Sequence, residues 1–242
     1  MKGALLIGID YKGKDNQLNG CMDDVREVKK FLEEKGYTNF VVLIEDGDLP
    51  ICENIMKGFN TLLNWVNSGE YDEVFIHYSG HGSHIVDRDG DEEDGYDEVL
   101  IPLDYDKRGI ITDDLINLHF VSKITNPDTK IYILTDCCHS GTIMDLEYHW
   151  KRNGWCKVND KKTVGNIICI SGCRDSEESA EIFNINNNGR WSGALTTTFL
   201  ELVQKNISLG DIVNLLILKL VPFGQFPQLT ASHPIDLNIN IL

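Results

Sequence analysis

The chain alternates between two hydrophobic periodicities, and the alternation predicts strands and helices in turn. Short, nearly continuous apolar runs are typical of strands buried inside a sheet. The predicted strands cover residues 3–9, 40–44, 73–78, 130–135 and 166–171. Apolar residues at helical spacing predict helices over residues 21–36, 51–66, 193–204 and 209–220. Because strands alternate with helices, we expect an α/β fold with a mostly parallel central sheet and helices on both faces.

Three segments depart from this rhythm. Residues 82–112 are acidic and rich in glycine, and a loop of that length inside a compact domain is usually functional. They are followed by a short predicted helix that starts at Asp113. The polar, basic residues 147–165 predict an exposed connection, and the alternation over residues 235–241 predicts a closing edge strand.

Size and charge limit the classes of protein that this chain can represent. Its 242 residues are enough for one sizeable core, and nothing in the sequence demands a second domain. The net charge of -16, without clusters of Lys and Arg, argues against nucleic acid and anionic membranes as partners. It favours cationic ligands and metal ions.

The cysteines and the N-terminus indicate the compartment. Seven cysteines with irregular spacing, two of them adjacent, do not form the pattern of a disulfide framework. A reducing, intracellular and cytoplasmic setting fits them better. The N-terminal apolar run is too short for a signal peptide or a membrane span, and it predicts the first strand instead.

Two strand ends carry the candidate chemistry. Asp136-Cys137-Cys138-His139-Ser140-Gly141 follows the strand at 130–135, and His77-Tyr78-Ser79-Gly80-His81-Gly82 completes the strand at 73–78. The carboxyl ends of parallel strands form the usual ligand site of an open sheet, so Cys138 and His81 make a candidate nucleophile and base. Cys137 points to the opposite face and is expected to be packing, His77 is expected to be structural, and His139 is expected to shape the turn.

The two strand-end segments resemble the catalytic signatures of metacaspases, the caspase-like cysteine peptidases of the C14 group. Further matches lie at residues 19–25, 95–98, 170–175, 193–196 and 227–234. The resemblance implies a caspase-like three-layer sandwich in one domain, 1–242, in a compact form without an N-terminal prodomain. It divides the chain into a part with the dyad (1–146), the exposed connection (147–165) and a small-subunit-like part (166–242).

The resemblance also implies roles for single residues. Cys138 would attack the scissile carbonyl, His81 would act as base and acid, and the N–H groups of Gly82 and Cys138 would hold the oxyanion. The implied S1 pocket, which takes Arg or Lys at P1, consists of Cys21, Asp24, Ser79 and Asp136. Carboxylates in such a pocket attract a guanidinium or ammonium group. Taken singly, Asp24 could instead be a carboxylate in the first turn of a helix, and Asp136 a strand-end cap.

Calcium is the cofactor that the resemblance implies, as an activator. The matching ligands are Asp97, Asp113, Asp114 and Asp145. Residues 87–98 also place acids at EF-hand positions, but position 6 is Glu92 rather than Gly and a strand precedes them. A solvated acidic loop is therefore the alternative there. Zinc could inhibit through Cys137, Cys138, His139 or His81, although the spacing is unlike a structural zinc motif.

The connection and the competing functions complete these expectations. Basic residues make 147–165 a candidate for self-cleavage, at Lys151, Arg152, Lys161 and Lys162, the alternative being a solvated linker. Protein substrates with Arg or Lys at P1 are the expected partners, and a monomer is the expected state. The competing classes are a catalytically silent caspase-like binding module and a calcium-binding protein.

Overall fold

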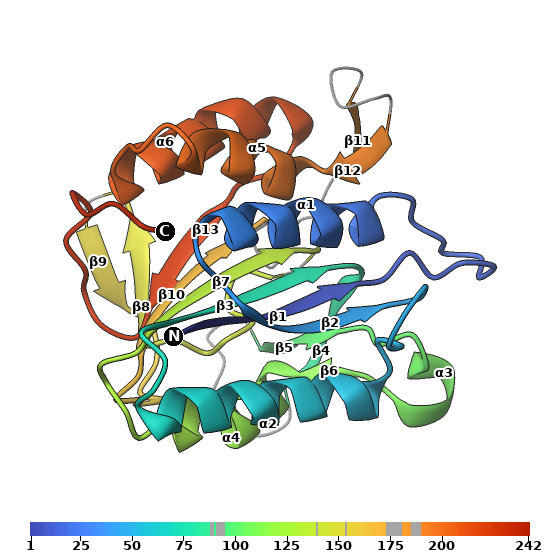
Figure 1. Ribbon diagram of the computed structural model, residues 1–242, viewed down its shortest axis with the longest axis horizontal. Coiled ribbons are helices and arrows are strands. Elements are labelled where there is room, and N and C mark those ends of the chain that lie inside the picture. The colour runs from blue at the N-terminus through green and yellow to red at the C-terminus, as the bar shows by residue number, and fades with distance from the viewer. Residues whose placement is uncertain (88–89, 91–94, 139, 153, 173–180, 185–189) are drawn as a thin grey trace.

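The computed structural model describes the chain except residues 88–89, 91–94, 139, 153, 173–180 and 185–189. Its centre is an eight-stranded mixed sheet (Figure 1). In spatial order the strands are β2 (Asn39–Ile44), β1 (Lys2–Gly8), β3 (Glu73–Ser79), β7 (Lys130–Asp136), β10 (Asn166–Ser171), β13 (Gln228–Ala231), β8 (Tyr148–Lys151) and β9 (Gly154–Lys157). The first five strands run parallel, and β13, β8 and β9 each pair antiparallel with their neighbours.

Helices cover both faces of the sheet, which confirms the predicted α/β sandwich (Figure 1). One face carries α1 (Cys21–Glu34), α5 (Ala194–Val203) and α6 (Leu209–Leu220). The other face carries α2 (Cys52–Ser68) and α4 (Asp113–His119), which leads into the 3₁₀ helix η1 (Val121–Lys123).

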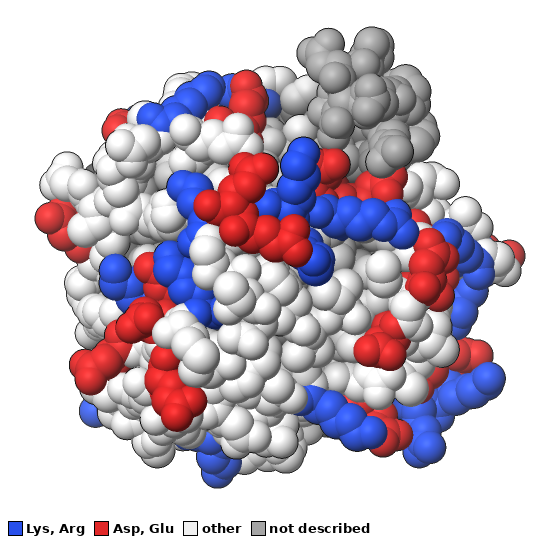
Figure 2. All heavy atoms as spheres, in the orientation of Figure 1, with Lys and Arg blue, Asp and Glu red and all other residues white. Residues whose placement is uncertain are grey.

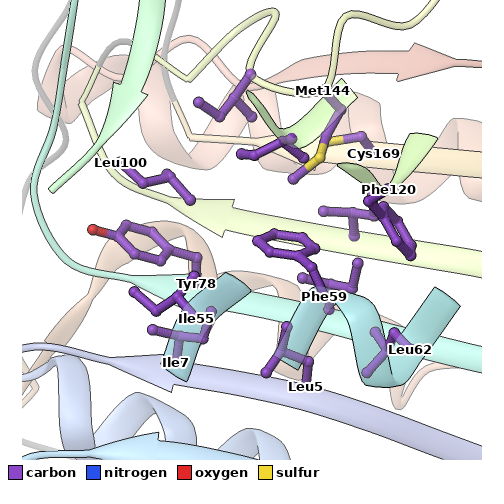
Figure 3. Close-up of a cluster of buried hydrophobic side chains, with 14 of the residues drawn as sticks. Leu5, Ile7, Ile55, Phe59, Leu62, Tyr78, Leu100, Phe120, Met144 and Cys169 are labelled. Atoms are coloured by element: carbon purple, nitrogen blue, oxygen red, sulfur yellow. The ribbon is translucent and has the colours of Figure 1, made fainter. Parts of the chain in front are cut away.

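Two hydrophobic cores lie on the two faces, because successive residues of a strand point to opposite sides. In β1, Leu5 and Ile7 belong to the core under α2, whereas Ala4 and Leu6 belong to the core under α1, α5 and α6. Figure 3 shows part of the first core, where aromatic and aliphatic side chains from α2 meet those of β1 and β3. The strands are rigid because both faces are packed, so their carboxyl ends make a firm platform.

The segment 82–112, predicted as a long loop, contains ordered structure. It forms a second, antiparallel sheet of β4 (Gly82–Val86), β5 (Tyr96–Leu100) and β6 (Ile111–Thr112), with the short helix α3 (Tyr105–Arg108) between β5 and β6. Burial of apolar residues of β5 and β6 stabilises this sheet. Half of the EF-hand-like positions, 88–89 and 91–94, lie outside the described residues.

The segment 147–165, predicted as an exposed connection, begins with the hairpin β8–β9. This hairpin extends the main sheet, because His149 and Tyr148 pair with Thr230 and Ala231 of β13. Its indole rings, Trp150 and Trp155, lie 5.5 Å apart. The connection is therefore partly built into the sheet and only its second half lacks regular structure.

The predicted strand at 235–241 is wrong. The last strand is β13, and residues 235–241 pack instead on the start of α6, where Leu237 and Ile239 accept backbone hydrogen bonds from Gly210 and Leu209. The side chains of Ile235, Leu237 and Ile241 join the core beneath α6, and these residues do not pair with a neighbouring strand. The remaining elements are the hairpin β11 (Glu181–Asn184) and β12 (Arg190–Gly193) and the 3₁₀ helix η2 (Val221–Phe223). Within the described residues, every helix is too short or too polar to span a bilayer.

Candidate active site

The two strand-end segments meet at the carboxyl edge of the sheet. β3 and β7 are parallel neighbours, and Ser79 lies opposite Asp136, so His81 and Cys138 follow at the same edge. The segments touch at Gly82, where a Cβ atom would lie only 2.1 Å from the carbonyl oxygen of Cys138. Glycine is required at this position because any side chain would push the two segments apart.

The ring of His81 is oriented by a backbone carbonyl. Its Nε2 lies 2.6 Å from the carbonyl oxygen of Asn16, which can only accept a hydrogen bond. Nε2 therefore carries a proton, and in the neutral imidazole Nδ1 keeps the lone pair. Sequence reasoning missed Asn16, because any residue type can supply a main-chain acceptor.

Two buried phenols fix the backbone of His81. The N–H of His81 donates to Tyr11 Oη at 3.0 Å, and Tyr78 Oη donates to the carbonyl of His81 at 2.7 Å. Burial raises the pKa of both phenols, so they stay protonated and able to donate. The Tyr11 ring also packs on the imidazole, with 4.7 Å between ring centroids. The sequence does not single out Tyr11, although it lies two residues after the first predicted strand.

The adjacent thiols differ in access. Cys137 is fully buried, whereas Cys138 is partly exposed. Ser140 Oγ donates to the carbonyl of Cys137 at 2.9 Å and so stabilises the turn that presents Cys138. His139 lies outside the described residues. A partly exposed thiol at a strand-to-turn junction is able to react, and Cys137 behaves as a small packed hydrophobe.

The predicted S1 carboxylates lie together at the N-terminus of α5. Asp24 accepts hydrogen bonds from Ser79 Oγ at 2.8 Å and from the N–H of Gly193 at 3.0 Å. Asp136 Oδ2 accepts from both the N–H and Oγ1 of Thr196, each at 2.8 Å. A Cβ atom on Gly193 would lie 2.1 Å from Asp136 Oδ2 and 2.9 Å from Asp24 Oδ2. The positive end of α5 offsets the repulsion between these two buried carboxylates.

A hydrogen-bonded chain connects His77 to Asp136. The Nε2 atom of His77 lies 3.2 Å from Thr196 Oγ1, whose single proton is donated to Asp136, so His77 Nε2 must be the donor. Burial lowers the pKa of His77 to about 3, which keeps the ring neutral. The sequence predicts a structural role for His77 but not the role of Thr196, although residues 193–196 are among the segments that carry the family resemblance.

Cys21, the remaining predicted S1 residue, begins α1. It is buried, and its N–H donates to Asp10 Oδ1 at 2.9 Å. Asp24 and Thr196 also line a cavity of about 180 Å³ between α1 and α5. Its further lining includes the acidic side chains Asp23, Glu27, Glu34 and Glu201 and the basic side chain Lys30. Acidic groups therefore outnumber basic ones in this lining, which favours a cationic group.

The structure brings three of the four predicted calcium ligands together. One carboxylate oxygen each from Asp113, Asp114 and Asp145 lie within 4.8 Å of one another. Asp97 is buried in β5 but does not belong to this group, which we call the acidic triad. Sequence reasoning missed Glu98, which is also buried and whose N–H donates to Asp113 Oδ2 at 2.9 Å. Burial, and next the charge of Asp145, raise the pKa of Asp113 to about 7.

One predicted self-cleavage residue lies at the acidic triad. The ammonium of Lys161 is 2.8 Å from Asp114 Oδ1 and 2.7 Å from Asp145 Oδ2. Lys151, Arg152 and Lys162 are exposed. Lys161 is thus held in ion pairs with the acidic triad, whereas the other three candidates for self-cleavage are exposed to solvent.

An α/β sandwich that presents a thiol and an imidazole at adjoining strand ends has the architecture of the caspase-like cysteine peptidases. The family described as metacaspase, peptidase C14 domain, matches residues 2–147. The chain belongs to this metacaspase family of cysteine peptidases, and its substrates are proteins.

Individual relatives agree with this assignment. Metacaspase-1 of Meyerozyma guilliermondii is 31% identical over 299 residues, covering 100% of this chain and 72% of the relative. Metacaspase-1B of Aspergillus terreus is 31% identical over 294 residues, covering 98% of this chain and 76% of the relative. The crystal structure of a Geobacter sulfurreducens protein has a TM-score of 0.72 at 21% identity, covering 99% of this chain and 98% of that chain, and shares the fold.

Proposed function

We propose that this protein is an endopeptidase that cleaves after Arg or Lys, with Cys138 as nucleophile and His81 as its base, and that calcium activates it. The observation that carries the proposed preference for Arg or Lys is the pair of buried carboxylates, Asp24 and Asp136. Asp136 ends the strand that the thiol follows. The contact between Gly82 and Cys138 supports the proposed dyad.

The orientation of His81 supports a particular proton route. With Nε2–H donated to Asn16, Nδ1 is the atom that takes the proton of the Cys138 thiol. The thiolate then attacks the scissile carbonyl, and the N–H groups of Gly82 and Cys138 stabilise the oxyanion. Nδ1–H protonates the leaving amine, and the resulting thioester is hydrolysed by a water molecule that gives its proton to the same nitrogen.

The two carboxylates favour a basic P1 residue on electrostatic grounds. A guanidinium or ammonium group would be attracted to both Asp24 and Asp136 in a site that is almost completely desolvated. An acidic P1 side chain would instead face two like charges. Arg offers a fork of N–H donors that matches a carboxylate, so it should be preferred over Lys.

The acidic triad supports the calcium part of the proposal. Asp113, Asp114 and Asp145 provide hard oxygen donors, which are the ligands that calcium prefers. Burial, and next the charge of Asp145, raise the pKa of Asp113, so an additional positive charge beside it would favour its ionised form. Calcium, when bound, would supply that charge. Asp145 follows the turn of Cys138 along the chain, so the triad and the thiol share one segment.

One assay tests the proposal: hydrolysis of fluorogenic peptides with Arg, Lys or Asp at P1, with and without calcium, by the wild type and Cys138→Ala. We expect cleavage after Arg and Lys that requires both calcium and the thiol. Preference for Asp would overturn the S1 assignment, and activity independent of calcium would overturn activation. Calcium binding without any thiol-dependent cleavage would favour the silent binding module or the calcium-binding protein.

A further inference from the structure

The acidic triad already has a cation beside it, and that cation belongs to the chain. Lys161 extends its ammonium to within 2.7 Å of Asp145 Oδ2 and 2.8 Å of Asp114 Oδ1. The side chain of Asp145 is 1% exposed and that of Lys161 is 23% exposed, so this contact is shielded from water. It differs from the exposed pairs on the surface, which contribute little to stability.

The backbone around Lys161 is fastened so that its side chain points inward. We call residues 158–163 the strap. The N–H of Val158 donates to the carbonyl of Glu147, and Thr163 Oγ1 donates to the carbonyl of Val121, each at 2.8 Å. Between these two anchors, the N–H of Lys161 donates to Asn159 Oδ1 at 3.0 Å. The neighbours Asp160 and Lys162 are exposed, so the strap directs one ammonium to the triad.

Lys161 and a calcium ion would need the same oxygens. Calcium takes carboxylate oxygens at about 2.3–2.6 Å, close to the positions that the ammonium already contacts. A calcium ion and the Lys161 ammonium on the same carboxylates would lie close together, and they would repel each other strongly in a site with little water. We propose that Lys161 is a tethered counter-ion, which holds the acidic triad together without calcium and which calcium must expel, releasing the strap. This inference rests on the proposed calcium site.

The release would couple calcium to self-cleavage. While its ammonium is paired with Asp145, Lys161 cannot enter an S1 pocket and the bond that follows it is protected. Lys151, Arg152 and Lys162 are exposed with or without this pairing. Cleavage after Lys161 therefore requires calcium for two reasons. Calcium frees the Lys161 side chain from the acidic triad, and it activates the enzyme.

Calcium titration calorimetry tests the competition in proteins that cannot cleave themselves. The background is Cys138→Ala, and the variant is Lys161→Met, which keeps the length of the side chain but removes the charge. The control is Lys29→Met, since Lys29 pairs with Glu33 within α1, on the opposite face of the sheet from α4. We expect Lys161→Met to bind calcium on the order of tenfold more tightly, and the control to match the background.

Thermal melting separates competition from a purely structural role. Lys161→Met should melt below the background without calcium, because Asp145 loses its counter-ion, and calcium should raise its melting temperature by more than that of the background. Equal calcium affinity of the background and Lys161→Met would overturn the tethered counter-ion. Absence of calcium binding in both proteins would instead overturn the proposed calcium site.

A second measurement requires no change at Lys161. Limited trypsin digestion of Cys138→Ala, followed by mass spectrometry, reports whether the bond after Lys161 is accessible. We expect that bond to be protected without calcium and cut with it, while cleavage after Lys151 and Arg152 stays unchanged. Equal cleavage after Lys161 in both conditions would contradict release of the strap.

Discussion

At the scale of single residues, His77 shows how a buried ring supports a charged neighbour without carrying charge. It is completely buried, and its Nε2–H donates to Thr196, which in turn donates to Asp136. Protonation would place a second donor, Nδ1–H, in the apolar core, where Nδ1 has no hydrogen-bond partner among the described residues. The ring therefore supports the hydrogen-bonded chain to Asp136 in its neutral form.

Replacing His77 with Gln should flatten the dependence of stability on pH. The pKa of His77 is about 3 in the folded protein, against an ordinary value of 6.5, so between these values the unfolded chain binds the extra proton and stability falls as the pH falls. From about pH 7 to about pH 5 the wild type should lose about 2 kcal/mol more than His77→Gln. Urea unfolding at several pH values measures the difference, and parallel curves for the two proteins would contradict the buried neutral ring.

At the scale of secondary structure, the N-terminus of α5 organises the proposed S1 pocket. The backbone N–H groups of Gly193 and Thr196 each bind one of the two carboxylates, which come from α1 and from the end of β7. A helix terminus supplies such donors in fixed directions. The geometry of the pocket thus depends on how α5 docks, and not only on the two Asp residues.

Removing the hydroxyl of Thr196 should lower the efficiency of cleavage after basic P1 residues. Thr196→Val keeps the shape but removes one hydrogen bond to Asp136, and a hydrogen bond to a charged group contributes about 1.5–3 kcal/mol. We expect kcat/KM for Arg at P1 to fall at least about tenfold.

Thr197→Val is the matched control, because Thr197 follows in the same helix but donates to Ser192 Oγ. The rate at which iodoacetamide alkylates Cys138 should not change in either variant, since that reagent does not use the S1 pocket. If Thr196→Val also slowed alkylation, the residue would be supporting the thiol rather than the pocket.

The elements also explain which parts of the fold the sequence could predict. The five parallel strands were predicted because burial on both faces produces uninterrupted apolar runs. β13 was missed because four residues carry little periodicity, and residues 235–241 alternate because they pack on α6, not because they pair. The strands of the second sheet were missed because they are short and because acidic residues lie within β5 and between the strands.

The same limits apply to the candidate site. Cys138 and His81 stand out as candidates because each follows a buried strand, whereas the acids of the triad are expected only from the resemblance to metacaspases. The roles of Asn16, Thr196 and Lys161 were not, because each depends on a contact with a residue distant along the chain. A main-chain carbonyl and a single hydroxyl leave no recognisable pattern in a sequence.

At the scale of the whole molecule, an excess of negative charge opposes folding. The net charge is -16, although acidic and basic side chains are interspersed over the face in Figure 2. Self-repulsion of this size destabilises the compact state, and salt screens it.

Sodium chloride should therefore raise the melting temperature in the presence of a chelator that removes divalent ions. Screening shortens the Debye length from about 30 Å at low salt to about 8 Å at physiological ionic strength. Each kcal/mol gained corresponds to about 2–4 °C for a chain of this size, so we expect a rise of a few degrees by calorimetry. A melting temperature that fell with salt would show that attractive ion pairs, such as those of Lys161, outweigh the repulsion.

The docking of α5 on Asp24 and Asp136 also orders events during synthesis. The thiol and the imidazole are both translated by residue 138, but Gly193 and Thr196 follow more than fifty positions later. Domains begin to fold from the N-terminus as the chain leaves the ribosome. A nascent chain can hold the proposed reacting pair and still lack the donors that position Asp24 and Asp136, so the proposed cleavage after basic residues would begin only once α5 has emerged.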